Sequence, residues 1–488
     1  MTIFRDNQFS ASNDTPLYRQ LCDHMQGAIL SGELKGGLKL PSTRALADEL
    51  SISRNTVLTA YRQLMAEGYI EGAEGSGTFV ARVLPEFLLT APSHKVSSKT
   101  GKIKLHQPQF SEHARLQMAA ALPQSNSRMP RPFASGTPAL DVFPYPLWSR
   151  LVARQARRMP DSSFAYQDAA GYRPLREAIA AHVTVSRRVH CTPEQIVIVS
   201  GSQGALDLVA RILINPGDPV WMEDPGYLGA RGAFLGANAH IIPVPIDNEG
   251  LVVEAGLALA PHARLVYLTP SHQFPLGVTM SLARRLEILD WAGREGAYIL
   301  EDDYDSEYRF GGRPLAALQS LDNSDRVIYI GTFSKVLFPA LRIGYLILPL
   351  PLVDTFLKVR SIIDVHTPIL EQSVLCDFIV EGHFIRHLRR MRTLYAQRRA
   401  ALIEAARRLP LEIYSPEAGI HCIGWLPKGM DDQSLVRRGT DLGLDLWSIS
   451  NFCMKPLARK GLLLGYGGYS IPKIKDGIRK LAMAMDSV

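Results

Sequence analysis

From Phe133 to the C-terminus, short apolar runs alternate with amphipathic helical segments, and this alternation constrains the fold more than any other feature of the chain. Strands that alternate with helices build a mainly parallel sheet with helices on both of its faces. The residues from about 380 to 488 mix long basic helices with short strands, which predicts a smaller α+β domain. The apolar runs that we expect to form strands are 196–201, 219–224, 264–270, 297–303, 326–332 and 344–349.

The composition changes twice before this region. Residues 14–81 contain short helical patterns that end in a glycine-rich turn, whereas residues 82–131 are interrupted by prolines and rich in Ser, Lys and Gln. The second composition is typical of a linker, in which one helical turn is expected around 113–122. A chain of 488 residues also exceeds what one small core holds. We therefore expect an N-terminal domain over 14–81, a linker over 82–131 and a large domain over 132–488.

The N-terminal segment has the pattern of a helix-turn-helix followed by a hairpin. In LPSTRALADELSISRNTVLTAYRQLMAEG, a helix opened by a hydroxyl cap and a tight turn precede a second helix. Such a second helix enters the DNA major groove with its N-terminal end. Ser53, Arg54, Asn55 and Thr56 lie at that end and are suited to phosphate and base-edge contacts. Residues 69–81 predict a two-stranded wing. The alternative is a small helical bundle in which the same residues only cap a helix.

Lys335 lies in the run GTFSKVLFPALRIGY, after small hydroxyl residues and seven positions before Arg342. This arrangement suits a lysine that forms a Schiff base beside a bound phosphate. Asp302 ends the apolar run AYILED, where a carboxylate would pair with a pyridinium nitrogen. The two features together predict pyridoxal 5′-phosphate (PLP) as a cofactor.

Further residues complete the predicted cofactor site. Ser202 and Gln203 begin a helix directly after a strand, where free backbone amides bind phosphate. Tyr227 would lie flat on the pyridine ring, and Tyr304 would bond to the 3′-oxygen of the cofactor. Each residue alone also fits an ordinary cap or turn, but their order at successive strand ends favours a ligand site. The phosphate ligands expected near the lysine are Thr332, Ser334 and Arg342.

The overall composition limits the other classes of function. The net charge of +7 and the pI near 9.1 permit a polyanionic partner. The five cysteines are scattered without the spacing of a zinc site, which predicts a reduced, cytoplasmic protein without a metal. The chain has neither an apolar run long enough for a membrane span nor a start typical of a signal peptide. No membrane association is expected.

The helix-turn-helix and wing motifs, from Thr15 to Val80, resemble the GntR family of winged-helix repressors. The resemblance implies double-stranded operator DNA as a partner, with the wing in the minor groove. The residues that it implies as DNA contacts are Arg44, Ser53, Arg54, Asn55, Thr56 and Gly75.

From Phe133 onward, the order of motifs is similar to that of fold-type I aminotransferases. The stretch FAYQDAAGYRPLREAIAAHV resembles the Tyr…Gly…PLR segment of that family. The resemblance implies a homodimer in which Tyr166 reaches the phosphate of the cofactor in the other protomer.

Two positions depart from the aminotransferase pattern. Phe274 stands where the family has an asparagine that touches the 3′-oxygen, and His272 or Gln273 is left as its substitute. The stretch LLLGYGGYS contains no arginine, although the enzymes clamp a substrate carboxylate there. Arg231 is the candidate for anion recognition and effector binding, with a surface salt bridge as the alternative.

The winged helix, the linker and the aminotransferase-like domain together resemble the MocR class of bacterial regulators. The resemblance implies a PLP-bound, head-to-tail homodimer whose large domain senses an amine or amino-acid effector, or PLP itself. Ligand-driven movement of that domain would change the operator spacing that the winged helices fit, so effector and DNA would be thermodynamically coupled. The alternative is a catalytically active PLP-dependent aminotransferase with an accessory N-terminal domain. A regulator that has lost PLP is disfavoured because Lys335, Asp302 and Arg342 are all present.

Overall fold

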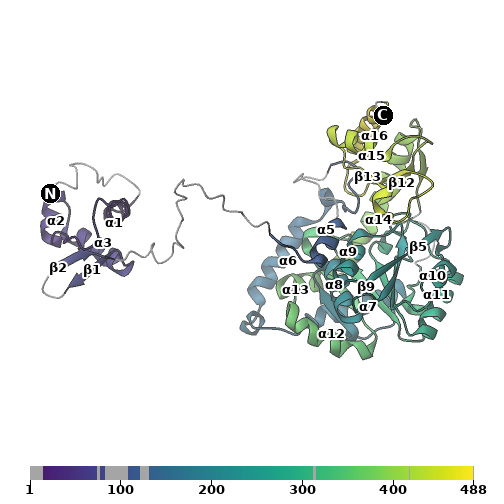
Figure 1. Ribbon diagram of the computed structural model, residues 1–488, viewed down its shortest axis with the longest axis horizontal. Helices are drawn as coiled ribbons and strands as arrows, with labels where there is room; N and C mark the ends of the chain where they lie inside the picture. Colours follow the sequence, from purple (N-terminus) through teal and green to yellow (C-terminus); the bar gives the residue numbers. More distant parts are fainter. Residues whose placement is uncertain are drawn as a thin grey trace. The chain divides into compact units, whose positions relative to one another are not determined.

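The computed structural model describes residues 15–73, 77–82, 108–120, 131–310, 315–416 and 418–486. The chain forms two compact units, Met1–Gln107 and Pro108–Val488, each of which has its own core (Figure 1). None of the helices in the described part of the chain combines the length and apolar character needed to cross a bilayer. Within the same ranges, no group of His, Cys, Asp and Glu side chains is arranged to hold a metal ion.

The first unit is a three-helix domain with an antiparallel hairpin. Its elements are α1 (Leu17–Leu30), α2 (Thr43–Leu50), α3 (Arg54–Ala66), β1 (Ile70–Ala73) and β2 (Gly77–Val80). The side chains of Val57, Tyr61 and Leu64 on α3 are buried in its core, as their helical spacing predicts.

Two serine caps and one left-handed residue shape the turn between α2 and α3. The Ser42 side chain accepts a hydrogen bond from the amide of Ala45 at the start of α2. Ser51 then ends α2 with a φ of 55°, and Ser53 caps α3 by accepting from the Thr56 amide. These local bonds fix a helix-turn-helix in which the start of α3 is exposed.

The second unit is built on an eight-stranded mixed sheet with the order β3-β10-β9-β8-β7-β4-β5-β6. The neighbours from β9 to β5 are parallel, whereas β10 runs antiparallel to both β3 and β9, and β6 runs antiparallel to β5. The strands are β3 (Ile196–Val199), β4 (Pro219–Asp224), β5 (His240–Asp247), β6 (Gly250–Leu251), β7 (Leu265–Leu268), β8 (Tyr298–Asp303), β9 (Val327–Thr332) and β10 (Gly344–Ile347). All six predicted strands are therefore present, and the mainly parallel sheet is confirmed.

Helices cover both faces of this sheet because its strands are apolar on both sides. Val220 and Met222 of β4 pack with α8, α9 and α12, whereas Trp221 between them packs on the opposite face and stacks on Trp291. The helices of the large domain are α6 (Tyr145–Arg158), α7 (Arg173–Arg187), α8 (Gly201–Leu213), α9 (Leu228–Gly236), α10 (Val253–Leu259), α11 (Leu282–Glu295), α12 (Leu350–Ile363) and α13 (Ile369–Val380).

A smaller α+β region forms the C-terminal part of the second unit, as the sequence predicts. Figure 1 shows α15, α16, β12 and β13 grouped around the C-terminus. Its antiparallel sheet has the order β11-β12-β14-β13. The elements are α14 (His383–Ala406), β11 (Glu412–Tyr414), β12 (His421–Trp425), α15 (Asp432–Asp441), β13 (Trp447–Ser448), β14 (Gly461–Gly465) and α16 (Ile471–Met485).

One short helix lies inside the segment that the sequence assigns to the linker. Helix α5 (Glu112–Ala119) packs against α9. The imidazole of His113 hydrogen-bonds the carbonyl of Gly236, and a Cβ added at Gly236 would lie 2.1 Å from the Gln117 amide nitrogen. The absence of a side chain at Gly236 thus permits the close contact, and α5 belongs to the second unit.

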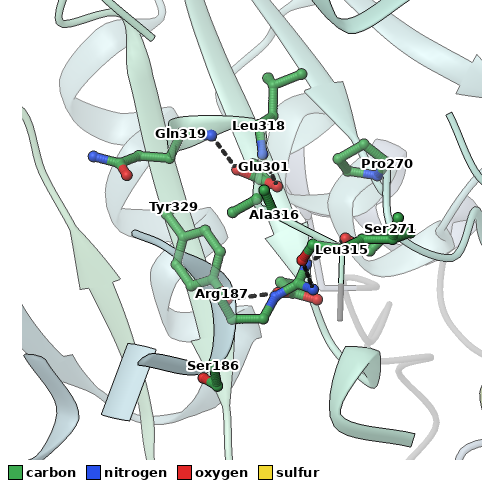
Figure 2. Close-up of polar contacts among 12 residues, drawn as sticks. Ser186, Arg187, Pro270, Ser271, Glu301, Leu315, Ala316, Leu318, Gln319 and Tyr329 are labelled. Atoms are coloured by element: carbon green, nitrogen blue, oxygen red, sulfur yellow. Dashed lines mark hydrogen bonds and ion pairs between the residues drawn. The ribbon is translucent and has the colours of Figure 1, made fainter. Parts of the chain in front are cut away.

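A network of buried polar contacts holds the end of β8 (Figure 2). The Arg187 guanidinium pairs with the Asp303 carboxylate at 2.7 Å and also donates to Ser271 and to the Leu315 carbonyl. Two positions before Asp303, the Glu301 carboxylate accepts hydrogen bonds from the backbone amides of Leu318 and Gln319. Glu301 and Asp303 flank Asp302 on β8. Their bonds hold the strand end in place and thereby orient the Asp302 side chain between them.

Candidate cofactor and DNA-binding sites

A cavity opens at the carboxyl ends of the parallel strands β4, β7 and β8, beside the smaller C-terminal region. Open α/β sheets commonly bind ligands at this edge. The sequence-predicted residues Lys335, Asp302, Tyr304, Tyr227 and Ser202 all line it. The other lining residues are Ser135, Gly136, Tyr267, Thr269, Phe274, Ile420, His421 and Trp447.

Asp302 at the end of β8 has one carboxylate oxygen without a partner. Its Oδ2 accepts a hydrogen bond of 2.8 Å from the Tyr267 hydroxyl, whereas Oδ1 is buried and unpaired. Burial raises the pKa of the Asp302 carboxyl to about 7, against the lowering effect of the Tyr267 hydrogen bond. A cationic N–H group placed at Oδ1 would satisfy the unpaired oxygen and stabilise the ionised carboxylate.

Lys335 lies on the connection between β9 and β10 and extends into the same cavity. A Cβ added at Gly136 would stand 2.6 Å from the Lys335 Nζ, so only glycine leaves room for the amine. Burial lowers the pKa of Lys335, and the carboxylates of Asp305 and Asp302 oppose this effect. A lowered pKa raises the fraction of neutral amine, which is the nucleophilic form.

Polar groups suited to an anion gather at the start of α8. Gly201 opens this helix with a φ of 79°, and a Cβ there would stand 3.1 Å from the Arg342 guanidinium. Arg342 has a φ of 52° and donates to the Ser200 carbonyl at 2.9 Å. The hydroxyl of Ser334 is buried and has no partner, while its amide donates to the Thr332 hydroxyl oxygen. A helix N-terminus beside an arginine and a free hydroxyl favours phosphate.

Tyr227 is positioned by the turn that follows β4. The Asp224 carboxylate accepts from the amides of Met454 and Lys455, and the Gly226 amide donates to the Phe452 carbonyl. These bonds tie the turn to the smaller C-terminal region.

An aromatic wall closes the cavity on the side of Tyr227. The Tyr227 ring meets the ring of Phe274 edge-on, with centroids 5.8 Å apart. Phe274 in turn packs edge-on against His421 and Phe452. This part of the cavity is therefore lined by apolar rings.

Six residues predicted from the sequence do not line the cavity: Thr332, Ser334 and Arg342, described above, and Gln203, Arg231 and Tyr166. The Gln203 side chain donates to the carbonyl of Gly229 and does not line the cavity. Arg231 lies on α9, likewise outside the lining residues. Tyr166 is 87% exposed and does not line the cavity of its own protomer.

Sequence reasoning missed Tyr267, His421 and Trp447, all of which line the cavity. Tyr267 was detectable in principle, because it is a polar aromatic residue near the end of a predicted buried strand. His421 and Trp447 belong to β12 and β13 of the smaller region, more than 80 residues after Lys335. Their approach depends on tertiary packing, for which no local pattern exists.

The first unit exposes the residues predicted to contact DNA. Arg54 and Asn55 are exposed at the start of α3, next to the Ser53 cap, and Arg44 is exposed on α2. The Thr56 hydroxyl lies 2.8 Å from that of Ser53, so both hydroxyls first stabilise the helix start. Gly75 lies outside the described residues.

The comparisons with known proteins give a family for each of the two units. Residues 17–80 match the family of bacterial regulatory proteins described as gntR, and residues 135–442 match aminotransferase class I and II. The probable rhizopine catabolism regulatory protein MocR of Rhizobium meliloti is 40% identical over 475 residues, covering 96% of this chain and 94% of the relative. The HTH-type transcriptional regulator TauR of Rhodobacter capsulatus is 31% identical and covers 96% of both chains.

A solved structure resembles the second unit. The α-aminoadipate aminotransferase LysN of Thermus thermophilus, complexed with N-(5′-phosphopyridoxyl)-L-leucine, superposes with a TM-score of 0.68 at 29% identity. The match covers 78% of this chain and 95% of LysN. The fold of the large domain is thus that of class I and II aminotransferases.

Proposed function

This chain belongs to the MocR class of transcriptional regulators, and from that premise we propose that it binds PLP at Lys335 and couples the state of this site to operator binding. The observation that supports the proposal is the shared cavity of Lys335 and Asp302. It presents an amine beside a carboxylate oxygen that has no partner. An amine and a buried acceptor in one cavity with aromatic rings in its lining suit a charged heteroaromatic aldehyde.

The residues of the cavity fit PLP. The unpaired Asp302 Oδ1 would accept from the pyridinium nitrogen, and Tyr227 would flank the ring. Tyr304 would bond the 3′-oxygen. The groups that would hold the phosphate are the backbone amides at the start of α8, the side chains of Ser202, Thr332, Ser334 and Arg342, and Tyr166 of the partner subunit; the Gln203 side chain, bonded to Gly229, would contribute only through its backbone amide. When bound, PLP supplies an aldehyde that reacts with amines and a ring that withdraws electrons.

The cavity favours sensing of a small amine over processing of dicarboxylic amino acids. Among the described residues that line the cavity, Lys335 is the only cation. No arginine in this lining is therefore placed to bind the side-chain carboxylate of a dicarboxylic amino acid. An amine effector would compete with Lys335 for the cofactor, which frees the lysine without any turnover. The second candidate function is transamination, which the similarity to the aminotransferase LysN favours.

We further propose that the protein acts as a cytoplasmic head-to-tail homodimer, with residues 82–131 connecting the DNA-binding domain 14–81 to the effector domain 132–488. The exposure of Tyr166 supports this arrangement, because a residue that serves the other protomer must face outward in its own. A two-fold dimer would carry two winged helices and therefore read two half-sites.

The proposed function is tested with the full chain and a DNA fragment selected from a random-sequence pool. We expect addition of PLP, and then of a primary amine such as 4-aminobutyrate or taurine, to change the operator Kd by roughly fivefold or more. The Kd is measured by fluorescence anisotropy at fixed salt, because salt alone shifts DNA affinity. A constant Kd combined with rapid amino transfer to a keto acid would identify the protein as an enzyme instead.

Replacing Arg54 with alanine is expected to weaken operator binding about 5- to 150-fold, which corresponds to roughly 1–3 kcal/mol for a base-edge contact. The side chain is exposed at the helix end that enters the groove and makes no described bond within the domain. Arg62→Ala is the matched control, since Arg62 is exposed on the same helix but lies two turns later. Equal losses in both variants would contradict a specific role for Arg54.

A further inference from the structure

Two buried side chains, His272 and Asp305, form a hydrogen-bonded group with the half-buried Tyr304 at the cavity. The Nδ1 of His272 lies 3.0 Å from the Tyr304 hydroxyl oxygen, and 3.0 Å and 3.1 Å from the two carboxylate oxygens of Asp305. His272 and Asp305 each have 1% of their side chains exposed, and neither lines the cavity. Tyr304 does line it. The hydrogen bonds of this pair therefore reach the cavity through the tyrosine.

The contact between Nδ1 and Asp305 determines where the tyrosine hydrogen points. A carboxylate only accepts, so an ionised Asp305 requires the hydrogen on Nδ1, and the Tyr304 oxygen can then only accept from that nitrogen. If Asp305 is protonated instead, its hydrogen occupies the single lone pair of Nδ1. In both cases Nδ1 has no place for the hydrogen of Tyr304. This hydrogen must turn away from His272, toward the cavity.

The imidazole of His272 is closely surrounded by backbone and by a second imidazole. A Cβ added at Gly419 would lie 2.2 Å from Cε1 of His272, and one added at Gly277 would lie 3.1 Å from Nε2. Both glycines have positive φ, and the His421 ring lies 5.0 Å away between centroids. The buried Nε2 has no partner, so a proton there would be unsatisfied. This favours the tautomer with the proton on Nδ1.

The neighbouring residues cannot take over this task. The Gln273 amide is already used, because it donates to the carbonyls of Pro225 and Phe274 and accepts from the Leu276 amide. Phe274 has no polar side-chain atom. The sequence left His272 and Gln273 as equal substitutes for the missing asparagine, and the geometry favours an indirect role for His272.

We propose that His272 and Asp305 are positioning residues that aim the Tyr304 hydroxyl hydrogen at the 3′-oxygen of PLP. This inference rests on the proposed function. The Tyr304 hydroxyl would then be a hydrogen-bond donor of fixed direction for the 3′-oxygen. Phe274, at the position of the missing asparagine, has no donor for that oxygen. A donor fixed in this direction stabilises the ionised 3′-oxygen relative to the protonated one.

The test is a pH titration of the visible absorbance of PLP bound to the full chain. Relative to the wild type, Tyr304→Phe and His272→Leu are each expected to raise the apparent pKa of the bound cofactor by about one unit. His272→Leu in the Tyr304→Phe background is expected to add no further shift, because both changes remove the same hydrogen bond. His272→Asn should restore most of the wild-type value, since its amide nitrogen can replace Nδ1.

The control is His182→Leu, which removes a histidine outside the cavity that packs on Phe384. Its titration should match the wild type. Additive shifts of Tyr304→Phe and His272→Leu, or no shift in His272→Leu, would overturn the positioning role while PLP binding stands. A wild-type protein without the visible band would overturn the proposed function and this inference together. If circular dichroism shows that His272→Leu is unfolded, the cycle of His272→Ala with Tyr304→Phe decides in the same way.

Discussion

After dialysis, a Lys335→Ala variant is expected to lose the visible absorbance band that PLP gives to the wild-type protein. The amine of Lys335 is the only one among the described residues that line the cavity, and burial lowers its pKa toward the reactive neutral form. Asp302 and the phosphate ligands remain, so weak non-covalent binding persists. Absorbance after dialysis, with and without borohydride treatment before denaturation, measures the loss: only wild-type protein should keep the chromophore on the denatured chain.

The matched control is Lys358→Ala on α12, because this lysine is exposed and pairs only with the exposed Asp354. Its band should equal that of the wild type. An unchanged band in Lys335→Ala would show that another amine holds the cofactor and would refute the assignment of Lys335. A colourless wild-type protein that PLP cannot reconstitute would refute PLP binding itself.

Replacing Arg187 with methionine is expected to lower the free energy of unfolding of the second unit by roughly 3–5 kcal/mol, the usual effect of breaking a buried ion pair. Arg187 and Asp303 have only 5% and 2% of their side chains exposed. Without the guanidinium, the Asp303 carboxylate stays buried with the Tyr329 hydroxyl as its remaining partner, and Ser271 and the Leu315 carbonyl lose a donor. Urea denaturation followed by circular dichroism measures the change.

Arg211→Met is the control for this prediction. Arg211 pairs with Asp207 on the exposed side of α8, so its loss should cost no more than about 1 kcal/mol. Because Arg187 supports the end of β8, we also expect Arg187→Met to weaken PLP binding more than Arg211→Met does. Equal unfolding free energies for the two variants would show that the buried pair is not needed for stability.

Local sequence patterns were sufficient to predict the strands whose residues are of one kind along their whole length. The six predicted strands are apolar at nearly every position, so their burial on both faces was evident from the sequence, whereas the antiparallel direction of β10 was not. β5 was missed because Pro243 and Pro245 interrupt it, and its residues alternate between buried and exposed positions. Proline is tolerated there because β5 is followed only by the short edge strand β6.

The site was partly predictable for a similar reason. Lys335, Asp302 and Tyr227 follow or end predicted strands, and the topology alone brings such strand ends to one edge of the sheet. Gln203 and Arg231 were chosen by residue type, but the direction of a side chain on a helix depends on packing that the sequence does not display. The same limit applies to His272 and Asp305, which are 33 positions apart and meet only through the fold.

The docking of α5 on α9 sets the length of chain that connects the second unit to the DNA-binding one. From Val83 to Gln107 the connection counts 25 residues, and covalent geometry limits its contour length to about 85 Å. One helical turn of DNA measures only about 34 Å. The covalent length of this connection alone therefore does not restrict a winged helix to one turn of the duplex. The spacing of the two operator half-sites must then be set by contacts between the protein domains or with the DNA, because the length of this connection does not set it.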